Sequence, residues 1–103
     1  MRVMVRFAVP VEAGNAALRT GKLEKVFHQI VEELKPEAAY FYPDGGERAG
    51  FFILNMQESS QIAAIAERFF FGLNAKVEMR PVMAPDDLAK GLAGVPDIVR
   101  RYG

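Results

Sequence analysis

Apolar and polar residues alternate at the start of the chain. Every second residue from Val3 to Val9 is apolar, and two arginines, Arg2 and Arg6, occupy positions between them. This period of two predicts a β-strand over residues 2–9 with one apolar face. Pro10 follows directly and is expected to end the strand, because proline has no backbone N–H to donate to a neighbouring strand.

Two longer segments have the period of an α-helix. Apolar residues recur at every third or fourth position over residues 22–35 and again over about residues 60–71. Each segment is therefore predicted to be a helix that buries a single stripe. Pro36 is expected to stop the first helix and Gly72 to close the second.

The remaining segments predict a hairpin, a further strand and a short helix. Residues 38–42 and 48–56 have the composition of strands, and the turn sequence Pro43-Asp44-Gly45-Gly46 between them makes a β-hairpin. Residues 76–83 are predicted to be the last strand. Pro85 then opens a short helix over residues 85–92.

This order of elements predicts the fold class. With right-handed crossovers, a strand, helix, hairpin, helix and strand give a ferredoxin-like βαββαβ sandwich, an α+β fold. Its four-stranded antiparallel sheet would carry both helices on one face, with residues 2–9 and 48–56 at the centre. We expect one domain over residues 1–92 and a C-terminal tail over residues 93–103.

The strand over residues 48–56 is apolar on both faces, which is typical of a strand buried on both sides. One face carries Ala49, Phe51 and Ile53, and the other carries Gly50, Phe52, Leu54 and Met56. Two helices can cover only one face, and a large bare apolar patch is unusual on a monomer. We therefore expect a homodimer packed sheet to sheet. The alternative is that the C-terminal segment half covers the second face.

The order of elements and the two-faced strand resemble those of the dimeric α+β barrel superfamily. Two segments, Lys35-Pro36-Glu37-Ala38-Ala39-Tyr40-Phe41 and Arg80-Pro81-Val82-Met83-Ala84-Pro85-Asp86-Asp87-Leu88, resemble those of a small bacterial family of unassigned function. The resemblance covers residues 1–92 and implies a dimeric barrel. The superfamily includes muconolactone isomerases, cofactor-independent monooxygenases and haem-binding proteins. The chain carries no catalytic signature of these, so the resemblance assigns no residue.

The charge balance and the apolar runs of the chain limit the classes of molecule that it could bind. Acidic and basic residues balance at 13 each, so no net field attracts nucleic acid or an anionic membrane. The segment Arg48-Ala49-Gly50-Phe51-Phe52 faintly resembles an RNA recognition motif, but the first strand has no stacking aromatic on its open face. No apolar run approaches the roughly 20 residues that cross a bilayer. We expect a cytoplasmic location, with no nucleic-acid or membrane partner.

Few side chains could carry covalent or metal chemistry. The chain has no cysteine, which excludes thiolate chemistry. The aliphatic hydroxyls occur only at Thr20, Ser59 and Ser60, where helix caps are expected. His28 lies off the buried stripe between Glu24 and Glu32, a spacing more typical of a solvated helix face than of a metal site. We expect neither a metal nor a cofactor.

The second face of the sheet is the expected site. The parity of the strands places Arg6, Glu78 and Arg80 there, and Tyr40 and Tyr42 join them if Phe41 is in the core. We expect the apolar neighbours on this face to be Phe52, Leu54 and Met56. An apolar cleft with a few convergent polar groups is the usual form of a small-molecule site.

Two interpretations of this face stay open at this point. An arginine could hold a carboxylate or enolate of a small anionic or phenolic metabolite, while a tyrosine donates or accepts a proton. Alternatively, Arg6 and Arg80 pair with Glu78 and seal a non-catalytic dimer. The sequence leaves open whether the protein is an enzyme. Phe71, opposite the stripe of the second helix, could add another contact surface.

Overall fold

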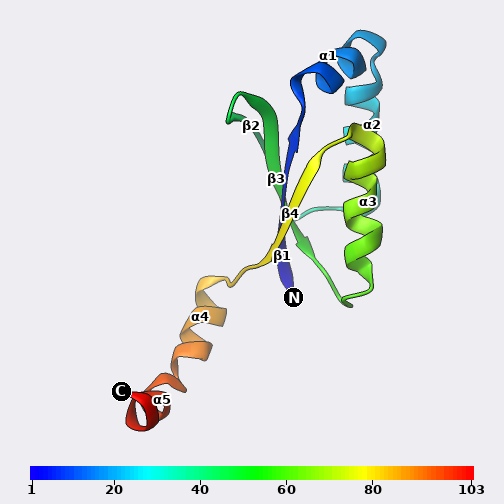
Figure 1. Ribbon diagram of the computed structural model, residues 1–103. Coiled ribbons are helices and arrows are strands. Elements are labelled where there is room, and N and C mark those ends of the chain that lie inside the picture. The colour runs from blue at the N-terminus through cyan, green and yellow to red at the C-terminus, as the bar shows by residue number, and fades with distance from the viewer.

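A computed structural model describes all residues, 1–103, as a four-stranded sheet with five helices (Figure 1). The elements follow the chain in this order: β1 (Arg2–Val9), α1 (Val11–Thr20), α2 (Lys22–Leu34), β2 (Ala38–Asp44), β3 (Glu47–Asn55), α3 (Gln61–Leu73), β4 (Lys76–Pro81), α4 (Pro85–Leu92) and α5 (Val95–Tyr102). None of these helices combines the length and the apolar character that crossing a membrane requires.

The sheet has the strand order β2-β3-β1-β4, and every neighbouring pair is antiparallel. Helices α2 and α3 lie side by side along one face of the sheet (Figure 1). The α+β class and the four-stranded antiparallel sheet predicted from the sequence are thereby confirmed, and the arrangement is ferredoxin-like. We call the covered face the helix side and the other one the open face.

The core lies between the helix side of the sheet and the two helices. Its largest fully buried side chains are Phe7, Phe52, Phe69, Val5 and Val9. The ring of Phe7 lies 5.2 Å from that of Phe69 on α3 and 5.3 Å from that of Phe27 on α2. Apolar burial of this kind is the main favourable term in folding, so the sheet and both helices stabilise one another through a shared aromatic centre.

Several helices begin or end at residues other than those predicted, because a neighbouring residue has a left-handed backbone conformation. The stretch before α2 forms a full ten-residue helix, α1. Gly21, with φ +79°, separates the two helices and takes the N-cap position expected for Thr20. Similarly, Gly72 lies inside α3, which ends at Asn74 with φ +52°. Both ends use the left-handed conformation that glycine and asparagine tolerate best.

The N-terminus of α3 is also capped differently. Ser60 occupies the N-cap position, but its side chain makes no capping hydrogen bond. Instead, the side-chain oxygen of Gln61 accepts hydrogen bonds from the backbone N–H groups of Gln57 and Glu58, at 2.7 and 3.0 Å. The carboxamide therefore fixes the incoming loop, while the serine hydroxyls expected to cap this helix do not.

The C-terminal segment extends away from the sheet (Figure 1). Neither α4 nor α5 contains a buried residue, and the radius of gyration is 17.2 Å, where a compact chain of this length would have roughly 13 Å. The segment expected as a tail of uncertain structure is helical over Val95–Tyr102. It does not cover the open face, so the alternative cover considered for that face is wrong. The domain boundary at residue 92 stays a prediction.

Candidate functional site

The open face brings most of the expected site residues into one row across the sheet. Arg6 on β1 lies directly opposite Glu78 on β4 and opposite Phe51 on β3, and Phe51 lies opposite Tyr40 on β2. Side chains of directly opposed residues point to the same face of a sheet. Tyr40, Phe51, Arg6 and Glu78 therefore form a continuous row.

The other two expected residues stand on either side of this row. Tyr42 is two residues along β2 from Tyr40, and Arg80 is two residues along β4 from Glu78, so both share the open face. The ring of Phe51 lies 5.5 Å from that of Tyr40 and 6.2 Å from that of Tyr42. Within the row, Tyr40 and Arg6 thus lie on opposite sides of Phe51.

The apolar part of the open face differs from the prediction. Phe52, Leu54 and Met56 are buried in the core, with no more than 6% of each residue exposed. Phe52 pairs with Val5 and Leu54 with Val3, so all of these side chains point to the helix side. The open face is instead lined by the half-buried Met4, Phe51 and Ile53. The prediction was off by one residue along the strand, which in a sheet exchanges the two faces.

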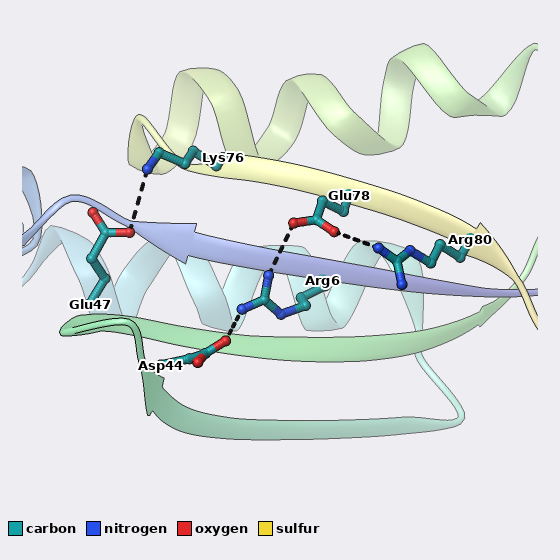
Figure 2. A network of polar contacts seen from close by, with 6 residues as sticks. All are labelled: Arg6, Asp44, Glu47, Lys76, Glu78 and Arg80. Carbon is teal, nitrogen blue, oxygen red and sulfur yellow. Dashed lines mark hydrogen bonds and ion pairs between the residues drawn. The ribbon is translucent and has the colours of Figure 1, made fainter.

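Polar contacts link the charged residues of the open face into a network (Figure 2). Arg6 donates from Nη1 to Glu78 Oε1 at 3.1 Å, and its Nη2 pairs with Asp44 at the end of β2. Arg80 donates to the other carboxylate oxygen of Glu78, also at 3.1 Å. The pKa of Arg6 is raised, first by its hydrogen bond with Tyr42 and then by the one with Asp44.

A shallow hollow of about 310 Å³ lies at the end of the sheet where this network meets the β2–β3 turn. Its charged lining, which we call the charged hollow, consists of Arg6, Asp44, Glu47, Lys76 and Glu78. Lys76 lies 3.8 Å from Glu47 and adds a second cation (Figure 2). Each cation of the hollow already faces a carboxylate, so the hollow offers paired charges and no free guanidinium.

Two other residues singled out from the sequence lie away from this face. The side chain of His28 is 82% exposed on α2, with Nε2 3.7 Å from Glu32 Oε2. The structure groups no three His, Asp or Glu side chains closely enough to hold a metal. Phe71 is 82% exposed on α3 and is not a member of the core cluster.

One charged residue on the helix side was missed by the sequence analysis. Arg48 belongs to β3 and pairs with Val9 on one side and with Pro43 on the other. The spacing along the strand could have revealed it. Arg48 stands two, four and six residues before Gly50, Phe52 and Leu54, and residues an even number apart in a strand point to the same face. An arginine on the buried side of a central strand is unusual, since long charged side chains are rarely buried.

Comparison with known proteins supports the fold of the chain but assigns no function to it. No protein-family model matches the chain, and no curated protein matches it. Five chains of solved structures match, one of them a formyltetrahydrofolate deformylase from Pseudomonas putida KT2440. That structure is 13% identical, with a TM-score of 0.50, over 80% of this chain. The aligned part spans only 29% of the deformylase, so the likeness supports the ferredoxin-like fold and no activity.

Proposed function

We propose that this chain is an assembly module that works as a homodimer, with the open faces of two sheets packed together as in dimeric α+β barrels. The observation that carries the proposal is the row of half-buried apolar side chains, Met4, Phe51 and Ile53, on a face that no element of the chain covers. Burying such side chains against a second copy removes apolar area from water, which drives association.

The charges of the open face are compatible with burial in such an interface. Arg6 and Arg80 both donate to Glu78, and Arg6 also faces Asp44. Charged groups are tolerated in an interface when they are paired and hydrogen-bonded. Because the network neutralises itself within one chain, two copies can approach without bringing together unpaired like charges.

A second candidate function is the binding of a small phenolic metabolite between the two sheets. The observation that favours it is the charged hollow of about 310 Å³, which a second copy would enclose further. Arg6 already faces two carboxylates. A neutral hydroxylated ligand therefore fits this hollow better than the anionic ligand also considered from the sequence, since an anion would have to displace Asp44 or Glu78.

The dimer is tested by sedimentation equilibrium of the wild-type chain and of Phe51→Glu. A charge placed at the centre of the interface is expected to weaken dimerisation about a hundredfold or more, because the carboxylate would be buried without a partner. Phe71→Glu is the matched control, since it makes the same change at an exposed position on α3. A wild-type chain that stays monomeric at high micromolar concentration would refute the proposal.

The second candidate is tested by titrating the dimer with phenol and with benzoate while amide resonances are followed by NMR. Shifts confined to residues around Asp44 and Glu78, larger for phenol than for benzoate, are expected if the charged hollow binds such ligands. If neither compound moves these resonances, the hollow only closes the interface.

A further inference from the structure

We propose that the C-terminal arm, residues 82–103, docks onto a second copy of this chain through its last helix, α5. The receiving surface is an open groove of about 450 Å³ between α3 and the edge strand β4. We call it the α3–β4 groove, and its apolar residues include Ile62, Ala66, Phe70, Val77 and Met79. The inference rests on the proposed assembly function and adds a contact between copies that is separate from the open faces.

The arm is helical although none of its residues is buried. Helices α4 and α5 have eight residues each, and all of them are at the surface. Isolated helices shorter than about 12 residues are marginal in water, because most helical stability in proteins comes from tertiary packing. The two helices of the arm therefore need a packing surface that the arm itself does not supply.

One side of α5 is apolar at the spacing of a helix that binds a groove. Its positions i, i+3, i+4 and i+7 are Val95, Ile98, Val99 and Tyr102, the pattern with which amphipathic helices insert into apolar grooves. All four are exposed. On the polar side, both arginines of the helix pair with Asp97. The polar side of α5 is thus satisfied within the helix, while its apolar side has no partner.

The α3–β4 groove matches this helix in length. Ile62 and Phe70 stand eight residues apart on α3, and they are 45% and 43% exposed. At 1.5 Å per residue their separation along the helix is about 12 Å, which is also the length of the eight-residue α5. Ala63 and Ala66 lie between them, and side chains this small let a second helix pack at a short interaxial distance.

Charge complementarity favours α5 as the occupant. Glu67 is the only charged residue that lines the groove, and it belongs to none of the ion pairs of the chain. The side chains of α5 carry two arginines and one aspartate, a net charge of +1, whereas α4 carries two aspartates and one lysine. Opposite charges across an interface steer association and fix its orientation. Glu67 therefore favours α5 over α4.

Contacts at the start of the arm direct it away from the groove of its own chain. The backbone N–H of Val82 donates to the oxygen of Arg2 at 3.1 Å, so the chain continues along β1 past the end of β4. Nη1 of Arg2 lies 3.7 Å from Oδ2 of Asp87, which also accepts a hydrogen bond from the N–H of Ala84 at 3.0 Å. These contacts hold α4 beyond the end of the sheet, whereas the groove lies alongside α3 (Figure 1). The occupant is therefore the arm of a second copy, and two copies can exchange arms reciprocally.

Paramagnetic NMR on mixed copies tests this contact. The chain has no cysteine, and a Cβ atom at Gly94, beside α5, would meet only one atom, at 4.0 Å, so Gly94→Cys gives a single site for a nitroxide label. The labelled chain is mixed with wild-type chain enriched in nitrogen-15, in which only contacts between copies weaken amide signals. We expect the strongest weakening at Ala63, Ala66 and Phe70. The same mixture with a diamagnetic label is the control.

Two results of these spectra would overturn the proposal. The first is a mixed sample in which the groove signals are not weakened, or in which the weakening is confined to the open face. The second is weakening of the groove signals only when the nitroxide and the nitrogen-15 are in the same copy, diluted with unlabelled wild-type chain. That result would place the arm in the groove of its own chain.

Sedimentation equilibrium separates the arm contact from the sheet-to-sheet dimer. Ile98→Glu places a carboxylate in the apolar stripe of α5 and is expected to weaken association at least about tenfold, because the charge would be buried without a partner. Phe71→Glu, on α3 but outside the groove, is the matched control and should leave association unchanged. If Phe51→Glu weakens association and Ile98→Glu does not, the sheet-to-sheet dimer stands and the arm contact fails. The reverse pattern would keep the arm contact and refute the sheet-to-sheet dimer.

Discussion

Replacing Gly50 by alanine tests how the sheet makes room for its aromatic centre. Gly50 lies opposite Phe7 on one side and opposite Phe41 on the other. A Cβ atom at this position would overlap the backbone oxygen of Tyr40 and would lie 2.7 Å from Cζ of Phe7. Its φ is not in the left-handed region, so this glycine is required for space and not for backbone conformation.

The expected loss of stability follows from these two contacts. Inserting a methyl group into a packed core costs about 1–3 kcal/mol. The ring of Phe7 can tilt away, but the oxygen of Tyr40 belongs to the paired strand and moves only if β2 moves, which places the cost in the upper part of this range. Alanine regains about 0.5–1 kcal/mol in a strand because it has less conformational freedom than glycine when unfolded. The net destabilisation of Gly50→Ala is therefore about 1–2.5 kcal/mol.

Urea unfolding followed by far-UV circular dichroism measures this change, at a protein concentration held constant for all variants. Gly91→Ala is the matched control, because a Cβ atom at Gly91 on α4 would meet no other atom within 4 Å. In that exposed helix, alanine is expected to be neutral or stabilising by up to about 1 kcal/mol. If Gly50→Ala unfolds within about 0.5 kcal/mol of the wild-type chain, β2 adjusts freely and the spatial argument for Gly50 fails.

Two further predictions concern charged side chains. Arg6→Met should weaken the dimer at least about tenfold in sedimentation equilibrium, because Asp44 would then be buried without its partner; an unchanged dissociation constant would contradict this. The pKa of Glu33 is lowered, mainly by a hydrogen bond from Arg68 and next by one from Gln29. Its stabilising effect is therefore present above the unfolded pKa of about 4.3 and is lost as the pH falls through the lower folded value. Glu33→Gln should flatten the loss of stability below about pH 5 in urea unfolding, and a decline parallel to that of the wild-type chain would refute it.

The sequence carried enough information for the elements and the sheet because each has its own period. The alternation over residues 2–9 matches Arg2–Val9, and the helical stripe over residues 22–35 matches Lys22–Leu34. The helix ends were harder to predict. Gly21 and Asn74 end or begin helices through a positive φ, and several residues next to them could have played that role equally well.

The faces of β3 could not be assigned from its own sequence. Both sets of alternate residues in this strand are apolar, so its sequence does not show which set faces the core. A shift of one residue exchanges all of its side chains between the two faces. The partner strand supplies the missing signal. Val5 and Val3 belong to a clearly one-sided strand, and their pairing with Phe52 and Leu54 fixes which residues of β3 enter the core.

The same register also assigns the residues of β3 to two different surfaces. Phe51 and Ile53 point to the open face, while Arg48 and Gly50 point to the helix side. The strand therefore contributes alternate residues to the proposed dimer interface and to the helix side of the sheet. A substitution at Phe51 should therefore change dimerisation without disturbing the core on the helix side. If it also lowered the stability of the monomer, the two surfaces would have to be coupled through the backbone of β3.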